Sequence, residues 1–214
     1  MLSANHHLLF IGDSVTDCGR ARPVGAGAPP ALGYGYVQLI DTELNTRHPG
    51  RTGRVTNMGT GGDTIRHLAA RWETDVIAQK PDWLSVMIGI NDVWRYFDPI
   101  NKPEAVPPRE YEQTYETLIA RTRPLLQGLV LMTPYYVEPD RAEPMRARMD
   151  EFSGIVAGLA QKHGAIFVDT QAAFDRVLVD TPAVTLAPDR VHPAPAGHQI
   201  LARAFCDAIG EPAR

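Results

Sequence analysis

The sequence contains little cysteine and no concentration of charge of one sign. Its 214 residues include only two cysteines, Cys18 and Cys206, which lie far apart and outside any C-x-x-C pair. A disulfide scaffold and a zinc ribbon are therefore not expected, and a reducing compartment suits these thiols. The formal net charge of −4, without a block of like charges, gives no electrostatic basis for binding nucleic acid or an anionic membrane.

Long hydrophobic runs are also missing. The first apolar run, at 8–11 within MLSANHHLLFIGDS, has no basic segment before it and is too short for a signal peptide or a membrane span. We therefore expect a cytoplasmic protein. The length, with 44% hydrophobic and 21% charged residues, is typical of a globular protein and predicts a single domain over residues 1–214.

What the sequence does contain is a regular alternation of two patterns. Short continuous apolar runs, typical of strands covered on both faces, occur at 8–11, 54–56, 83–90, 129–133 and 166–168. Apolar residues recur at helical three- and four-residue steps at 65–76, 111–119, 145–159 and 200–208. The alternation predicts an α/β fold, with a five-stranded parallel sheet between two layers of helices. The glycine- and proline-rich segments 21–35 and 95–108 are predicted loops.

Polar residues and glycines stand where these predicted strands end. Gly12-Asp13-Ser14 follows the first run, N-M-G-T-G-G-D-T (57–64) follows the second, and G-I-N-D (89–92) closes the third. A fourth group, D-R-V-H-P (189–193), precedes the last helix. Open parallel sheets carry their sites beyond the carboxyl ends of the strands. We therefore expect the first three groups to meet at one edge, which the fourth reaches from its loop.

Together these groups supply what acyl transfer requires. A serine hydroxyl needs a base to take its proton, and the imidazole that does so needs an orienting carboxylate. Ser14, His192 and Asp189 provide these three groups. The oxyanion that forms needs preorganised donors, for which the backbone N–H groups of Ser14 and Gly62 and the amide of Asn91 are candidates.

Several neighbouring residues have other predicted roles. Asp13, Asp63 and Asp92 are expected to cap helices or to accept backbone N–H groups. Trp94, three residues after Asn91, is predicted to lie in the mouth of the site, where it contacts substrate or fills an oligomer interface. Arg95 and Tyr36 are further candidates for substrate contact. No cofactor and no metal are required by this chemistry.

The four groups, in this order, resemble the four sequence blocks of the SGNH (GDSL-type) esterase family. The resemblance extends from about Leu8 to Phe205. It implies a flavodoxin-like three-layer α/β/α fold. It also implies Ser14 as nucleophile, Gly62 and Asn91 as oxyanion donors, and Asp189 and His192 as the remaining pair.

Within that family the chain is similar to the cytoplasmic acetylxylan-esterase type. The segments that carry this similarity are GDSVTDCGRARP, LGYGYV, RWETDVIAQKPDWLSVMIGINDVWR, EPMRARMDEF and FVDTQAAFD. It implies the removal of acetyl groups from xylose-based oligosaccharides and assembly as a homo-oligomer. The chain departs from that type just before Asp189, where 186–188 read Leu-Ala-Pro and an aromatic residue is expected.

Three other functions remain open from the sequence. A short-chain lipase or thioesterase would use the same residues. A metal-dependent phosphoesterase would use the oxygen and nitrogen ligands Asp13, Asp17, Asp63, Asn91, Asp92 and His192. A carbohydrate-binding protein without activity is the third, because a fold does not fix a function.

Overall fold

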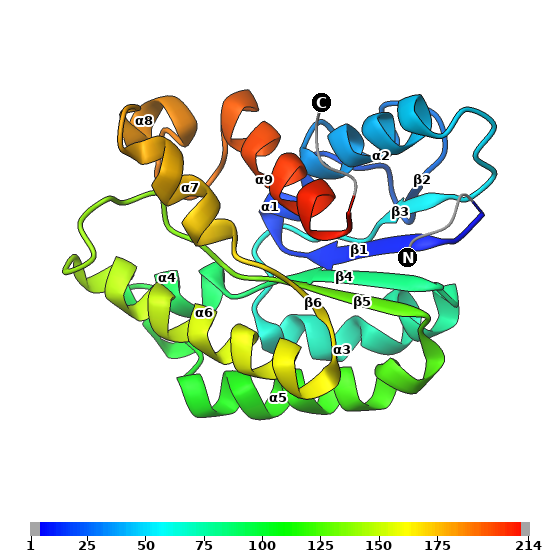
Figure 1. Cartoon of the computed structure of the whole chain (residues 1–214). Coiled ribbons are helices and arrows are strands. Elements are labelled where there is room, and N and C mark those ends of the chain that lie inside the picture. The colour runs from blue at the N-terminus through cyan, green and yellow to red at the C-terminus, as the bar shows by residue number, and fades with distance from the viewer. Residues whose placement is uncertain (1–4, 211–214) are drawn as a thin grey trace.

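The computed structural model, which describes residues 5–210, is built around one sheet with the strand order β2-β3-β1-β4-β5-β6 (Figure 1). The strands are β1 (Leu8–Gly12), β2 (Gly25–Ala26), β3 (Val55–Asn57), β4 (Trp83–Met87), β5 (Gly128–Met132) and β6 (Ile166–Val168). All neighbouring pairs are parallel except β2 with β3. The predicted α/β architecture with a parallel sheet is confirmed.

The predicted strand number of five is wrong, because β2 adds a sixth strand at one edge. It lies in the segment 21–35, whose glycine and proline content predicts a loop. Gly25 and Ala26 pair antiparallel with Asn57 and Thr56 of β3. A strand of two small residues has no apolar alternation, so only the pairing with β3 defines it.

Helices cover both faces of the sheet (Figure 1). One face carries α2 (Tyr36–Arg47), α7 (Thr170–Leu178), α8 (Ala183–Leu186) and α9 (Pro195–Ala208). The other carries α3 (Ile65–Asp75), α4 (Ile90–Phe97), α5 (Pro108–Thr122) and α6 (Pro144–His163). The one-turn α1 (Ser14–Asp17) follows β1, and three 3₁₀ turns are η1 (Ile77–Gln79), η2 (Lys102–Glu104) and η3 (Arg123–Leu125).

The two hydrophobic cores follow from strand geometry. Successive side chains of a strand point to opposite faces, so an unbroken apolar strand supplies both layers. In β1, Leu9 and Ile11 pack with α3, α5 and α6, whereas Leu8 and Phe10 pack with α2 and α9. All four side chains are fully buried. The run of apolar residues at 8–11 is thus explained by helices on both sides.

The third predicted strand is too long at its carboxyl end. The apolar run continues to Ile90, but β4 ends at Met87 and α4 begins at Ile90. Gly89 between them has a φ of +136°, a conformation that L residues rarely adopt. Hydrophobicity does not mark this boundary, because the strand end and the first turn of α4 are both buried.

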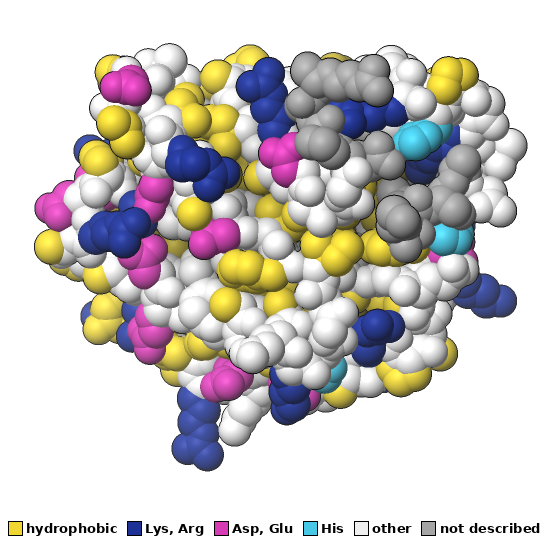
Figure 2. Space-filling model, viewed as in Figure 1, with side chains coloured by type: hydrophobic (Ala, Val, Ile, Leu, Met, Phe, Trp, Pro, Cys, Tyr) yellow, Lys and Arg dark blue, Asp and Glu magenta, His cyan; other side chains and the backbone are white. Residues whose placement is uncertain are grey.

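The molecular surface has no broad patch of one charge on the face drawn in Figure 2, where acidic and basic side chains are interspersed. Among residues 5–210, no helix is both long and apolar enough to cross a bilayer. The single domain over 1–214 stays a prediction, and residues 1–4 and 211–214 lie outside the described part of the chain.

Candidate active site

Ser14, His192 and Asp189, from opposite ends of the chain, lie within hydrogen-bonding distance of one another. Ser14 Oγ is 3.0 Å from Nε2 of His192, and Nδ1 of the same ring is 2.6 Å from Oδ2 of Asp189. The structure therefore brings together the three side chains that the sequence proposed as nucleophile, base and orienting carboxylate.

Ser14 is presented by an abrupt change from strand to helix. β1 ends at Gly12, where a Cβ would lie 2.3 Å from the carbonyl oxygen of Met87, so no larger residue fits. Asp13 then caps α1, and its Oδ1 accepts a hydrogen bond of 3.0 Å from the Val15 N–H. This is the bracing role expected of Asp13, and it places Ser14 at the first residue of the helix.

A tight loop before α9 carries both the carboxylate and the imidazole. Asp189 Oδ1 accepts the N–H groups of Val191 at 3.0 Å and of His192 at 2.7 Å. The loop is tied to the segment after β5 by a 2.9 Å bond from the Val137 N–H to the Arg190 carbonyl. Burial acts to raise the pKa of Asp189, but the hydrogen bonds from His192 and Val191 outweigh it and lower that pKa. The carboxylate therefore stays ionised and accepts from the ring.

The glycine-rich segment after β3 lies against the serine. A Cβ at Gly61 would be 3.9 Å from Ser14 Cβ, and the Gly61 N–H donates to Oδ2 of Asp17 at 3.0 Å. Gly62 has a φ of +83°, which favours glycine at this position. Within the described chain its N–H donates to no other group, so it is available to a ligand at the site.

Asn91 is the second residue of α4, and its side chain is buried beside the same segment. Its Nδ2 donates to the Asp63 carbonyl at 2.9 Å. A primary amide has two N–H groups, so this bond fixes the side chain and leaves a second donor. The next residue, Asp92, accepts the Ile65 N–H at 3.0 Å, as expected for a carboxylate that braces the start of a helix.

Two carboxyl groups are buried at the base of the site. Burial raises the pKa of Asp92 to about 7, although the Ile65 N–H acts in the opposite direction. Burial also raises the pKa of Asp13 to about 7, against the bond from Val15 and with a further contribution from the charge of Asp92. Both carboxyl groups accept backbone N–H groups around the site, from Val15 and Ile65, and are not the carboxylate that binds His192.

Arg71 of α3 organises the same edge of the sheet and was not identified from the sequence. Its guanidinium donates to the Asp63 carboxylate at 2.6 Å and to the carbonyls of Met58 at 2.6 Å and Gly12 at 2.9 Å. It therefore links the ends of β1 and β3. Helical periodicity marks Arg71 only as a polar position, and nothing in the sequence marks its distant carbonyl partners.

The predicted rim residues have different outcomes. Trp94 lies beside the triad, with its ring centroid 6.2 Å from that of His192 and 38% of its surface exposed. The structure does not support the substrate contact predicted for Tyr36, because the residue is only 1% exposed and its hydroxyl is hydrogen-bonded to Thr16 Oγ1 at 2.9 Å. Arg95 is turned to the protein, since its Nη2 donates to the Gly62 carbonyl at 2.5 Å.

His198 and Cys18 lie close to the nucleophile in sequence or space but belong to a separate contact. His198 Nδ1 accepts the Tyr36 N–H at 3.2 Å, and its Nε2 is 3.5 Å from Cys18 Sγ. Burial lowers the pKa of His198 to about 4, which keeps the ring neutral. Among residues 5–210, no three His, Cys, Asp or Glu side chains are grouped so that they could hold a metal ion.

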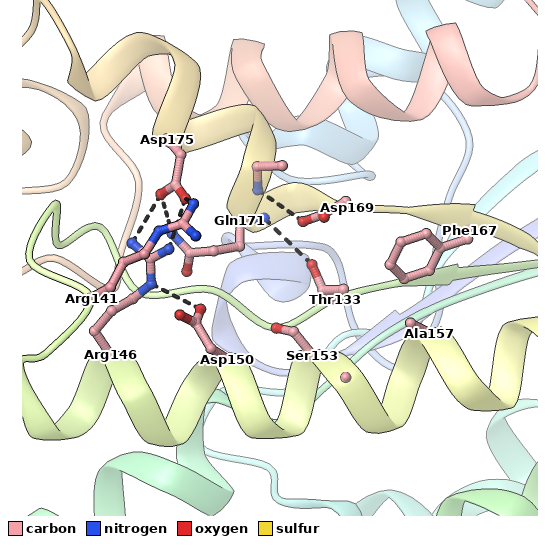
Figure 3. A pocket seen from close by; sticks show the side chains of 12 residues that line it. Thr133, Arg141, Arg146, Asp150, Ser153, Ala157, Phe167, Asp169, Gln171 and Asp175 are labelled. Atoms are coloured by element: carbon pink, nitrogen blue, oxygen red, sulfur yellow. Dashed lines mark hydrogen bonds and ion pairs between the residues drawn. The ribbon is translucent and has the colours of Figure 1, made fainter.

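A hollow of about 380 Å³ lies elsewhere, between α6, α7 and β6 (Figure 3). Its polar end is an ion-pair network in which Arg146 binds Asp175 at 2.7 Å and Asp150 at 2.9 Å. The Arg146 guanidinium also donates to the Glu138 carbonyl at 2.5 Å. Phe167 lines the other end, next to Ala157. None of the triad residues borders this hollow.

Comparison with known proteins gives consistent results. The profile of the GDSL-like lipase/acylhydrolase family matches residues 10–200. The chain is 52% identical over 210 residues to the acetylxylan esterase of Geobacillus stearothermophilus, covering 98% of this chain and 96% of that protein. Its structure is similar to that of a catalytic Ser-to-Ala mutant of this esterase, Axe2, with a TM-score of 0.96 and the same coverage.

Further solved structures are similar. They include catalytic mutants of Axe2 in which a histidine or an aspartate is replaced by alanine, each with a TM-score of 0.96 at 52% identity. LAE5, described as an alpha/beta hydrolase from the metagenome of Lake Arreo, is 47% identical, covers 100% of this chain and 99% of its own, and has a TM-score of 0.96. The chain thus belongs to the GDSL-like lipase/acylhydrolase family and is a carboxylic ester hydrolase.

Proposed function

We propose that this ester hydrolase removes acetyl groups from xylo-oligosaccharides through an acyl-enzyme on Ser14. The observation that carries the mechanism is the chain of contacts from Ser14 Oγ to His192 and from His192 to Asp189, at 3.0 and 2.6 Å. Ser14 Oγ attacks the ester carbonyl carbon while His192 Nε2 takes its proton. Asp189 holds the ring and stabilises the imidazolium that forms.

The reaction proceeds in two stages, formation of an acetyl-serine and its hydrolysis, each through a tetrahedral intermediate. The bond from carbon to the sugar oxygen breaks, and that oxygen takes the proton from His192, which leaves an acetyl group on Ser14. Water attacks the acetyl-serine with His192 as base, acetate leaves, and the proton returns to Ser14 Oγ. In both stages the negative oxygen is held by the N–H groups of Ser14 and Gly62 and by Nδ2 of Asn91.

The substrate assignment is supported by the relatives. The chain is 52% identical to an acetylxylan esterase, and other structures at 52–53% identity are those of an acetyl-xylooligosaccharide esterase. The indole of Trp94, beside His192 and partly exposed, suits stacking on a pyranose ring.

Two properties of the molecule in the cell accompany this proposal. Neither Cys18 nor Cys206 forms a disulfide, which fits a cytoplasmic location. Assembly as a homo-oligomer follows from the resemblance to the acetylxylan-esterase type. Light scattering after size-exclusion chromatography tests this assembly, and a monomer at working concentrations would contradict it.

Hydrolysis of 4-nitrophenyl acetate and of acetylated xylo-oligosaccharides tests the reaction. Ser14→Ala should lower kcat at least about 1,000-fold, because the nucleophile is removed. The matched control is Ser153→Ala, which replaces a serine on α6 outside the triad and should retain activity. A phosphonate directed at serine should abolish activity, and a chelator should leave it intact. Preference for long acyl chains or thioesters would contradict the acetyl-sugar assignment, and activity lost to the chelator alone would indicate the metal-dependent reaction.

A further inference from the structure

The Gly62 N–H belongs to the middle one of three successive peptide groups. On one side, the N–H of the Thr60–Gly61 peptide donates to Asp17 Oδ2 at 3.0 Å. On the other side, the carbonyl of the Gly62–Asp63 peptide accepts from Arg95 Nη2 at 2.5 Å. The peptide that presents the Gly62 N–H is therefore held through its two neighbours, and its own N–H stays free.

The two residues that hold these neighbours stand on the elements that carry the other oxyanion donors. Asp17 lies in α1, the same helical turn as Ser14, and Arg95 lies in α4 with Asn91. Asp17 therefore connects the glycine segment to the helical turn of Ser14, and Arg95 connects it to the helix of Asn91. These two contacts link the three oxyanion donors to one another. Glycine peptides reorient easily, and the backbone bond that spans them, from the Asp63 N–H to the Thr60 carbonyl, is long at 3.3 Å, so these two side-chain contacts further restrict the direction of the Gly62 N–H.

Asp17 and Arg95 each form an ion pair with a second residue. Asp17 Oδ2 binds Arg22 Nη2 at 2.5 Å, and Arg95 Nη1 lies 2.6 Å from Glu104 Oε2 in η2. The Arg95 side chain is only 17% exposed. With one amino group on the Gly62 carbonyl and the other against Glu104, its guanidinium is directed to the protein and away from an incoming sugar.

We propose that Asp17 and Arg95 are positioning residues that fix the Gly62 N–H in the oxyanion hole by binding the peptide groups on either side of it. The inference rests on the oxyanion role of Gly62 in the proposed function. It assigns Arg95 a role different from the substrate contact predicted from the sequence. Loss of one oxyanion donor typically lowers the rate about 10²–10³-fold, so loss of its orientation should have a smaller but clear effect.

Kinetics of variants test the proposal. Arg95→Met should lower kcat about 10- to 100-fold with KM within about two-fold, because the donor acts on the transition state more than on bound substrate. Arg95→Lys, which can still donate to the Gly62 carbonyl, should recover part of the loss. Asp17→Ala should resemble Arg95→Met, whereas Asp17→Asn, which can still accept from Gly61, should be closer to the wild type. Arg121→Met removes an exposed ion-paired arginine of α5 and is the matched control, with unchanged kcat.

Binding in the Ser14→Ala background separates positioning from substrate contact. The Kd for an acetylated xylo-oligosaccharide, measured by calorimetry, should be the same with and without Arg95→Met. A weakened Kd would overturn the proposal in favour of substrate contact, and an unchanged kcat in both Arg95→Met and Asp17→Ala would also overturn it. If Ser14→Ala itself retained turnover, the proposed function would fail instead, so the two failures are distinguishable. Should Arg95→Met not fold, Arg95→Lys and the two Asp17 variants provide the same comparison.

Discussion

Three aspartates close to Ser14 differ in chemistry because their surroundings differ. Asp189 is partly exposed and hydrogen-bonded to His192, and its pKa is lowered despite burial. Asp13 and Asp92 are completely buried and have pKa values raised to about 7. Residue type alone therefore assigns no role, and the hydrogen-bond partners of each carboxyl decide whether it is charged in the working enzyme.

Asp92 should make the stability of the protein depend on pH. Its pKa is about 7 in the folded protein against 3.8 for an aspartate in an unfolded chain, so the folded state binds more protons between these values. The contribution of Asp92 to stability is then fully present below about pH 4 and is lost as pH rises through about 7. Asp92→Asn removes this titration and can still accept the Ile65 N–H. The gain in the free energy of unfolding of Asp92→Asn over wild type should be larger at pH 8 than at pH 5, by about 3 kcal/mol at most.

Urea denaturation at both pH values measures this difference. Asp98→Asn is the control, because hydrogen bonds from Asn101 and Ile100 lower the pKa of this exposed carboxyl and keep it charged throughout that range. Equal effects of Asp92→Asn at the two pH values would show that Asp92 does not titrate there.

At the scale of elements, α4 joins two parts of the site. Its first turn carries Asn91 as a candidate oxyanion donor, and one turn later Trp94 reaches the rim beside His192. This helix follows β4 after only two residues. Its position at the carboxyl end of the sheet is therefore determined by the strand.

Trp94→Ala tests whether the rim recognises sugar. We expect KM for acetylated xylo-oligosaccharides to rise about 10-fold, because the contact of an aromatic ring with a partner of this size contributes about 1 kcal/mol or more. The kcat/KM for 4-nitrophenyl acetate should change little, since that substrate has no pyranose. Tyr96→Ala, also aromatic and exposed on α4 but packed against Lys102 and Arg148, is the matched control. Equal losses on both substrates would indicate a general role of Trp94 in the site.

The sequence was informative about elements with continuous apolar runs and less so about their ends. The runs at 8–11 and 129–133 correspond closely to β1 and β5, because both strands are buried on each face. The strand predicted at 83–90 extends too far, since the backbone conformation of Gly89 and not hydrophobicity ends it. β2 was missed because a two-residue edge strand depends on its partner. Likewise, residue type and order were enough to predict that Ser14, Asp189 and His192 lie together, which the structure shows, whereas the contacts of Arg71 and Arg95 depend on carbonyl groups that no pattern records.

At the scale of the whole molecule, a buried arginine joins α6 to α7 and to the segment after β5. The guanidinium of Arg146 contacts Asp150 and Asp175 (Figure 3) and also donates to the Glu138 carbonyl. Burial acts to raise the pKa of Asp175, but the hydrogen bonds from Arg146 and Gln171 outweigh it and lower that pKa. The partners lie up to 29 residues from Arg146, so the sequence alone did not show the network.

Arg146→Met should destabilise the fold without affecting catalysis. Removing one partner of a buried ion pair leaves the other charge uncompensated and typically costs about 3–5 kcal/mol. Urea denaturation measures the free energy of unfolding, and kcat should be unchanged where the variant is folded. Arg148→Met, two residues along α6 and paired with Glu151 nearer the surface, should cost less than about 1 kcal/mol. A similar cost for both variants would contradict a special contribution of Arg146.

The contact between Ser14 and His192 spans 178 positions of the chain. A polypeptide that stops before position 192 has the hydroxyl without the imidazole. With the roles proposed for Ser14 and His192, such a fragment should be inert toward esters. Ester turnover should therefore report, without any attached tag, that translation has passed position 192 and that these two distant segments have closed into one fold.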